Sequence, residues 1–410
     1  MDEGQLDINV CDIDVGRPIP NALVSISTSG RPEDVVEELT TDSSGQTPRI
    51  TLPTPPIDYS LSPSEPKPFS EYDVRISMDG FEPVTVERVQ IFPESTALQS
   101  ICLHPADSFE ISPEAIVIPD PVLWGQYPSK IPENPVKELP PSTGFVVLSK
   151  PVVPETIVVH SGAPSNASAQ NYWVPFKDYI KNVASSEIYA NWPEATLRAN
   201  ILAIISLTLN RVYTEWYRSK GYSFTITNST AYDQAFTYGR NIFEEISVVV
   251  DDVFTTYITK PNIRQPLFSQ YCDGKRTVCP NWMSQWGSKD LGDQGYSAIE
   301  ILKKYYGNDV YLMQAEKVEG VPVSFPGTTL QVGSSGPNVR VVQEQINAIA
   351  NNYPALKKLN VDGAYGESTK ASVMKFQEIF KLPASGVVDF STWYKLSAIY
   401  VAVTRMAEGV

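Results

Sequence analysis

The centre of the chain contains the stretch VPFKDYIKNVASSEIY, residues 174–189. Apolar side chains recur in it at helical spacing: Phe176, Tyr179, Ile180 and Val183. This period predicts an amphipathic helix. Glu187 follows Val183 by four residues, so a continuing helix brings its carboxyl group onto the apolar face. A carboxyl group placed there is partly desolvated, which raises its pKa.

Working outward from this helix, bulk composition narrows the class of protein. The chain has 410 residues and a formal net charge of -15. An acidic surface argues against binding to nucleic acid or to an anionic membrane. The N-terminus is acidic without an apolar core, so no signal peptide is predicted. The longest strongly apolar run, residues 201–209, is about half of the ~20 residues that a membrane span needs. We expect a protein that is synthesised in the cytoplasm.

The N-terminal part alternates apolar and polar residues in short runs, as in residues 6–10, 23–27 and 72–77. A period of two predicts half-buried strands, and the intervening Gly and Pro turns favour a β-sandwich over residues 1–105. The stretches GRPIPNALVSI at residues 16–26 and TDSSG at residues 41–45 resemble the carboxypeptidase regulatory-like family. That resemblance implies a non-catalytic pre- or pro-region. The Pro-rich residues 106–155 are predicted to form an extended, exposed linker with a processing site.

The C-terminal part, residues 326–410, repeats a pattern of glycine turns that lead into helices. LQVGSSGPNVRVVQ at residues 330–343 and VDGAYGEST at residues 361–369 resemble the peptidoglycan-binding type 1 family. The apolar stripes of these helices predict a three-helix core. The resemblance implies a wall-binding domain, for which we expect contacts from Asp362, Gly363 and Tyr365. Trp393 is a further candidate that suits the core equally well.

The central part, residues 156–325, resembles the stage II sporulation protein D (SpoIID/LytB) family. Three blocks agree in order: residues 174–200, TNSTAYDQAFTYG at residues 227–239, and MSQWG at residues 283–287 with its following helix. The resemblance implies an α+β domain with lytic transglycosylase activity in sporulation. Two positions depart from the family: Ile188-Tyr189 replaces the more frequent Met-Pro, and residues 200–203 replace a Gln/Ala-rich run. These departures weaken the transfer of substrate detail.

The resemblance assigns Glu187 the role of catalytic acid/base, and the helical position agrees with it. A carboxyl group that stays protonated near neutral pH suits a general acid for a glycosidic oxygen. Most glycosidases pair two carboxyl groups. A transglycosylase can use one, which first protonates the leaving oxygen and then activates the muramic 6-hydroxyl to close an anhydro ring. The alternative interpretation is a capping or solvated glutamate at the helix end.

Further substrate-binding candidates come from polar and aromatic residues near these blocks. Amide and hydroxyl groups suit sugar hydroxyl and acetamido groups, and aromatic rings stack on sugar faces. The alternatives are loop-bracing hydrogen bonds for the polar residues and burial for the aromatic ones. The candidates are Gln234, Ser284, Gln285, Trp286, Tyr189 and Tyr271.

Cys272 and Cys279 form a C-x6-C pair that allows three interpretations. A structural zinc needs two further ligands, and the two histidines, His104 and His160, are distant in sequence. A short loop disulfide or two free thiols therefore suit the pair better, and no cofactor is predicted. The shortage of histidine also argues against a Ser-His-Asp hydrolase.

The layout of the whole chain resembles the clostridial spore cortex-lytic enzymes, which are made as inactive precursors. It implies a multidomain α+β protein that cuts the glycan strands of cortex peptidoglycan and is activated by a protease. We expect synthesis in the mother cell and deposition in the cortex or coat region of the spore. The alternatives are a wall-binding helper like the amidase enhancers and a structural spore protein.

Overall fold

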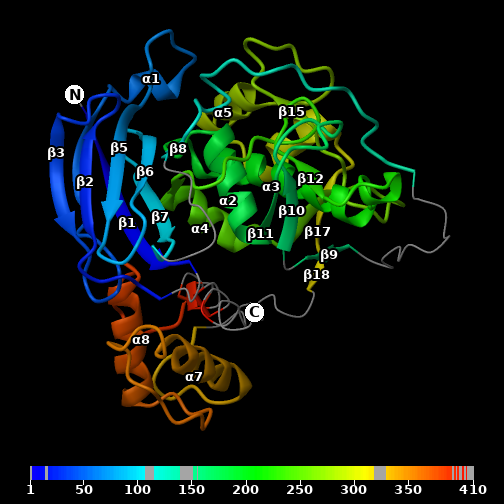
Figure 1. Ribbon diagram of the computed structural model, residues 1–410. Coiled ribbons are helices and arrows are strands. Elements are labelled where there is room, and N and C mark those ends of the chain that lie inside the picture. The colour runs from blue at the N-terminus through cyan, green and yellow to red at the C-terminus, as the bar shows by residue number, and fades with distance from the viewer. Residues whose placement is uncertain are drawn as a thin grey trace.

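The computed structural model describes residues 2–13, 17–106, 115–138, 151–154, 156–317 and 329–389, together with residues 392, 393, 395, 396, 399, 400 and 403. It is a multidomain α+β protein, as predicted, with eight α-helices among the described residues. Figure 1 shows the sheets of the N-terminal part beside a helix-rich central part, with two C-terminal helices below the sheets.

The N-terminal part consists of two β-sheets with a shared apolar core. One sheet has the order β13-β7-β1-β4, from β1 (Asp2–Asp12), β4 (Ile50–Thr54), β7 (Thr96–Leu103) and β13 (Ile242–Phe243). The other has the order β3-β2-β5-β6-β8, from β2 (Leu23–Thr28), β3 (Val35–Thr40), β5 (Ser70–Ser77), β6 (Val84–Ile91) and β8 (Ala115–Val117). The predicted alternation is confirmed, because Leu6, Ile8 and Val10 are buried along β1. A short helix, α1 (Asp58–Leu61), follows β4.

One covalent bond lies within the N-terminal sheets, and one strand pairing attaches them to another part of the chain. A disulfide joins Cys11 and Cys102 on the neighbouring parallel strands β1 and β7. Strand β13 belongs by sequence to the central part, yet it pairs with β7, with Phe243 opposite Ala97. The central part thus completes a sheet of the N-terminal part.

The central part is built around the helix α3 (Glu194–Tyr213), which is buried over most of its length. A helix that is apolar all round needs partners on all sides. It packs against α2 (Phe176–Glu187), α4 (Glu244–Val253), α5 (Gln285–Asp293), α6 (Ala298–Tyr306) and β14 (Thr256–Thr259). The predicted helix that carries Glu187 is confirmed as α2, although it ends at Glu187 and not, as expected, near Trp192-Pro193.

Small sheets surround these helices. Strand β10 (Thr156–His160) lies between β11 (Asn171–Pro175) and β12 (Ile226–Thr227), and β14 pairs with β17 (Tyr311–Gln314). Two further pairs are parallel: β15 (Tyr271–Cys272) with β16 (Met283–Ser284), and β9 (Val152–Val153) with β18 (Glu316–Lys317). A short 3-10 helix covers Arg218–Lys220. Within the described ranges, no helix has both the length and the apolar character of a membrane span.

Residues 118–138, named the strap from here on, follow β8 and run along the central part, where Figure 1 shows them as a cyan-to-teal trace. The expectation of an exposed linker is only partly met by the strap: Ile131 is exposed, whereas Ile118, Leu123 and Lys137 are buried. The physical reason is its proline content: an extended chain without its own ladder leaves its carbonyl groups free for donors elsewhere. The predicted processing site falls partly on residues 107–114 and 139–150, which lie outside the described residues.

The C-terminal part contains the helices α7 (Pro337–Ile349) and α8 (Glu367–Ile379). Their apolar stripes meet in one core with Val339, Val342, Val373 and Phe376 fully buried. Trp393 also lies in this core, with no exposed surface. The third helix stays a prediction, since the residues after 389 are described only in part.

Candidate active site

Glu187 is the last residue of α2 and lies on its buried face. Val183 and Ile180 occupy the preceding turns of that face, and the Glu187 side chain is 1% exposed. Its Oε1 accepts a hydrogen bond of 2.8 Å from the backbone N–H of Ala235. Its Oε2 accepts none from the described residues. A buried carboxyl oxygen without a donor is costly to ionise and is available to a ligand.

Burial dominates the ionisation of Glu187. It raises the pKa of the carboxyl group above its ordinary value, against the lowering effects of the Lys130 ammonium group, the Tyr271 hydroxyl and the Ala235 N–H. The Tyr271 hydroxyl is near enough to act electrostatically but does not reach full hydrogen-bond geometry with Oε2. A raised pKa keeps the group protonated to higher pH, as a general acid requires.

Gln234 orients Tyr271 instead of facing open space. Its Nε2 donates to the Tyr271 hydroxyl at 3.1 Å and to the Ile204 carbonyl at 3.1 Å. Its Oε1 accepts from the hydroxyls of Tyr179, at 3.1 Å, and Thr208, at 2.8 Å. With every polar atom paired and no exposed surface, Gln234 acts through Tyr271. The prediction of direct sugar binding by Gln234 and Tyr271 is therefore corrected to a positioning role, because both are buried around Glu187.

Lys130 of the strap is a further charged residue near this group. Its ammonium group donates to the backbone carbonyl of Asp233 and lies 4.7 Å from the centre of the Tyr271 ring. Burial lowers the pKa of Lys130, and the carboxylates of Glu187 and Asp233 oppose this. Sequence analysis missed Lys130, since no local pattern links residue 130 to residue 187. A cation thus lies near the candidate acid in the intact chain without forming an ion pair with it.

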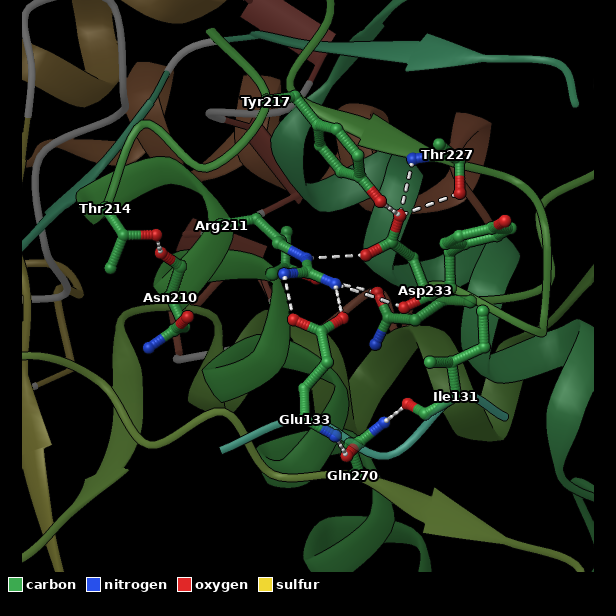
Figure 2. A network of polar contacts seen from close by, with 12 residues as sticks. Ile131, Glu133, Asn210, Arg211, Thr214, Tyr217, Thr227, Asp233 and Gln270 are labelled. Carbon is green, nitrogen blue, oxygen red and sulfur yellow. Dashed lines mark hydrogen bonds and ion pairs between the residues drawn. The ribbon is translucent and has the colours of Figure 1, made fainter. Parts of the chain in front are cut away.

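A second polar network fixes the loop that carries Ala235 (Figure 2). One oxygen of Asp233 accepts from the Tyr217 hydroxyl at 2.7 Å and from the Thr227 hydroxyl and N–H at 2.7 and 3.0 Å. Its other oxygen accepts from Nε of Arg211 at 2.6 Å. Arg211 also forms a bidentate pair with Glu133 of the strap, at 2.6 and 3.1 Å. Sequence analysis did not predict this network. The signal that could have indicated it is Arg211, a charged residue in the last turn of the nearly apolar helix α3.

The remaining substrate-binding candidates have structural roles in the intact chain. Ser284 caps α5 by accepting from the Gly287 N–H at 2.9 Å. Gln285 is buried and donates to the Glu187 carbonyl at 3.2 Å. Tyr189 and Trp286 are buried with Trp192, and Tyr189 also contacts Phe92 of the N-terminal sheets. The expectation of sugar stacking by these two rings is corrected, because other aromatic side chains cover them.

The three wall-binding candidates brace a turn of the C-terminal part. Asp362 accepts from Gln343 at 2.8 Å and from the Ala364 N–H at 2.9 Å, and Gly363 adopts a φ of 75°. Tyr365 is only 2% exposed, and its hydroxyl donates to the Gly386 carbonyl at 3.0 Å. Tyr365 is therefore a core residue, and its predicted contact with glycan is corrected.

The alternatives for the central cysteine pair are decided in favour of the loop disulfide. A bond joins Cys272 and Cys279, so neither sulfur is a free thiolate for zinc. The enclosed loop contains Asp273, which accepts from the Arg276 and Thr277 N–H groups. No group of three or more potential metal ligands is found among the residues that the structure describes.

Comparison with known families and sequences supports one domain. Residues 335–396 match the family model described as "Putative peptidoglycan binding domain". A curated relative, the zinc D-Ala-D-Ala carboxypeptidase of Streptomyces albus G, is 38% identical over 69 residues, which are 17% of this chain and 26% of that protein. The chain thus spans about a quarter of that relative. It contains a peptidoglycan-binding domain, and peptidoglycan is the partner that this domain supports.

Solved structures resemble only a part of the chain. The Bacillus anthracis TIE protein is 14% identical, covering 26% of this chain and 17% of its own, with a TM-score of 0.19. The minor pilin GBS52 of Streptococcus agalactiae is 16% identical, covering 27% of this chain and 48% of its own, at 0.18. The 5-hydroxyisourate hydrolase of Klebsiella pneumoniae is 18% identical, covering 25% of this chain and 91% of its own, at 0.17. At these scores, the likeness carries no argument about function.

Proposed function

We propose that this protein is a lytic transglycosylase that cuts the glycan strands of peptidoglycan, with Glu187 as its acid and base. One observation carries the proposal: Glu187 is buried with a raised pKa, and its Oε2 has no hydrogen-bond donor among the described residues. Desolvated carboxyl groups of this kind are typical of catalytic acids. The peptidoglycan-binding domain supports the same substrate class, because it would hold the chain on the polymer.

The proposed reaction needs one carboxyl group in two protonation states. Protonated Glu187 donates its proton to the glycosidic oxygen as the bond from that oxygen to the anomeric carbon breaks. The resulting carboxylate then accepts the proton of the muramic 6-hydroxyl, whose oxygen bonds to the anomeric carbon and closes the anhydro ring. The acid is thereby regenerated. Tyr271 and the Ala235 N–H orient and stabilise the carboxylate between the two steps.

We further propose that the intact chain is the inactive precursor of an enzyme that degrades the spore cortex, as the resemblance to clostridial cortex-lytic enzymes implies. Lys130 supports this, because the strap holds its ammonium group beside Glu187. The Lys130 cation opposes the raised pKa of Glu187, so its departure would remove one effect that favours the ionised carboxylate. The two disulfides join residues within the N-terminal part and within the central part. Neither disulfide therefore holds the strap to the central part after a cut within residues 139–150.

Mass spectrometry of cut peptidoglycan tests this proposal. A specific protease site placed within residues 141–149 allows the full chain to be compared before and after cutting. We expect anhydro-muramic ends only after cutting, and a loss of at least about a hundredfold in Glu187→Gln. The matched control is Glu194→Gln, since Glu194 is an exposed glutamate at the start of α3. Retention on peptidoglycan without new ends in any form would favour the wall-binding helper or the structural protein instead.

A further inference from the structure

The strap lies in a groove of the central part and is held there mainly through its backbone. The Val122 N–H donates to the Ser186 carbonyl at 2.8 Å, directly beside Glu187. The Ile131 N–H donates to the Ala231 carbonyl at 2.7 Å, and the Pro135 carbonyl accepts from the Phe268 N–H at 2.8 Å. The groove thus recognises extended peptide groups along its length, on both sides of Lys130.

Two glutamines of the groove each pair with the N–H of one peptide group of the strap and with the C=O of another. Gln265 accepts from the Lys137 N–H at 2.9 Å and donates to the Lys137 carbonyl at 2.8 Å. Gln270 accepts from the Glu133 N–H at 2.9 Å and donates to the Ile131 carbonyl at 2.8 Å, as Figure 2 shows. Each glutamine side chain therefore binds one backbone N–H and one backbone C=O of the strap at the same time.

Both glutamines are buried and held in place from behind. Gln265 is 6% exposed, and its Oε1 also accepts from Nδ2 of Asn210 at 3.0 Å. Gln270 is 2% exposed, and its backbone carbonyl accepts from the Tyr306 hydroxyl at 3.0 Å. When the strap leaves, the two side chains lose their hydrogen bonds to it but stay fixed in place. Amide groups held in one orientation are preorganised for a ligand that again supplies donors and acceptors.

Open space continues on both sides of the strap. A cavity of about 250 Å³ is lined by residues 125–130 and by Thr230, Asp273 and Arg276. A larger cavity, of about 620 Å³, is lined by strap residues between 131 and 138 and by the rings of Trp216, Tyr222 and Tyr232. Aromatic rings that line a cavity suit a sugar, whose apolar face stacks while its polar groups form hydrogen bonds.

We propose that this groove is the binding site for an N-acetylated glycan strand, in which Gln265 and Gln270 pair with acetamido groups, and that the strap occupies it in the intact chain. An acetamido group carries an N–H and a C=O of the same kind as those that neighbouring peptide groups of the strap offer to the glutamines. The proposal rests on the proposed function for its substrate class. It adds the residues that recognise the sugar and the reason that a peptide can replace it.

A locked strap tests whether sugar and strap exclude one another. Ile131→Cys with Ala231→Cys joins the strap to the groove at two backbones that are already hydrogen bonded, which is within reach of a disulfide. The full chain carries the protease site within residues 141–149 and Glu187→Gln, so that no product forms. Calorimetry then measures binding of tetra-N-acetylchitotetraose to the cut protein with and without the lock. We expect the unlocked protein to bind the sugar at one site more than the locked protein does. At that site the affinity should be at least about tenfold higher than any binding that the locked protein shows. Equal binding in both forms, or in neither, would overturn the proposal.

The acetamido groups themselves are tested by removing either partner of the pair. The unlocked cut protein should bind the fully de-N-acetylated tetrasaccharide at least about tenfold more weakly, since each lost hydrogen bond contributes about 1 kcal/mol. Gln265→Met and Gln270→Met keep the volume and remove both polar atoms, so each should weaken binding of the acetylated sugar alone. Gln294→Met at an exposed site is the matched control. If both sugars bind equally to the unsubstituted groove, the proposal fails whatever the folding of the variants.

These binding measurements are independent of cleavage. If the glycan is bound as proposed and no anhydro-muramic ends form with Glu187 present, the proposed function fails while the groove assignment stands. If ends form but the lock and the glutamines have no effect on binding, the groove assignment fails alone.

Discussion

At the scale of single residues, the candidate acid depends on a few groups that act on one carboxyl. Among these groups, the Tyr271 hydroxyl can be removed with little other change, because a phenylalanine ring can stay in the same place. Burial raises the pKa of Tyr271 well above its ordinary value, so the hydroxyl keeps its proton. It accepts from Gln234 and directs that proton toward Glu187.

Tyr271→Phe should move the pH dependence of cutting to higher pH. The Tyr271 hydroxyl lowers the pKa of Glu187, so removing it leaves the acid protonated to higher pH. The basic limb of the rate profile of the cut protein should therefore shift upward, by up to about one pH unit. Tyr172→Phe, which removes a partly exposed hydroxyl bonded to Gln170, is the control. A shift to lower pH would show that Tyr271 does not act on Glu187 in this way.

The residue scale also shows where sequence patterns are informative. The helical period placed Glu187 on the apolar face of α2, and that position is confirmed because a helix sets it locally. The same reasoning did not separate Ser284 as a cap, Tyr365 as a core residue or Gln234 as a positioning residue. Each of those roles depends on a partner elsewhere in the chain, such as Tyr271 for Gln234 and Gly386 for Tyr365.

At the scale of elements, the strap depends on side chains that donate to its carbonyl groups. Arg276 donates to three of them, Val122 at 2.8 Å, Trp124 at 2.7 Å and Gly125 at 2.8 Å. Asp273 orients Arg276 by accepting from its Nε at 3.1 Å, within the loop that the Cys272–Cys279 disulfide closes. A charged donor that serves three carbonyls is a stronger anchor than a neutral one.

Arg276→Ala in the uncut chain should loosen the first half of the strap. Loss of these hydrogen bonds should raise amide hydrogen exchange at Val122, Trp124 and Gly125 by about tenfold or more, since bonds from a charged donor contribute about 1.5–3 kcal/mol. Lys275→Ala, at the exposed neighbouring residue, is the matched control. Unchanged protection at these amides would mean that the apolar contacts of Leu123 hold the strap without Arg276.

At the scale of the whole molecule, the N-terminal sheets and the central part share one interface. Phe92 contacts Tyr189 and Phe243, and β13 extends the sheet of β7. Glu245 at the start of α4 accepts from the Thr96 N–H at 3.1 Å, while its Oε2 has no partner among the described residues. Burial raises the pKa of Glu245 to about 7. The interface therefore contains a carboxyl group that titrates near neutral pH.

The stability of this interface should fall as the pH rises. Because the folded pKa of Glu245 is raised, its contribution is fully present below the ordinary value of 4.5 and is lost as the pH rises through about 7. Glu245→Gln keeps the acceptor for Thr96 and removes the titration. Between pH 5 and pH 8, the melting temperature of the wild-type protein should fall by a few degrees relative to the variant, because about 1 kcal/mol corresponds to about 2–4 °C for 150–250 residues.

Thermal unfolding followed by circular dichroism at several pH values measures this difference. Glu194→Gln provides the control for replacing an exposed glutamate. A difference between the wild-type protein and Glu245→Gln that stays constant over this range would contradict the assignment of the titration to Glu245.

The sequence by itself determined the features that depend on near neighbours along the chain. The alternation in β1, the face of α2 that carries Glu187 and the turn-and-helix order of the peptidoglycan-binding domain all follow from local periods. Only the tertiary structure decided that Lys130 lies near Glu187, that Gln265 and Gln270 pair with the strap, and that β13 joins a sheet of the N-terminal part. These contacts join residues about 50 to 150 positions apart, and their partners are selected by the path of the chain, which no local period encodes.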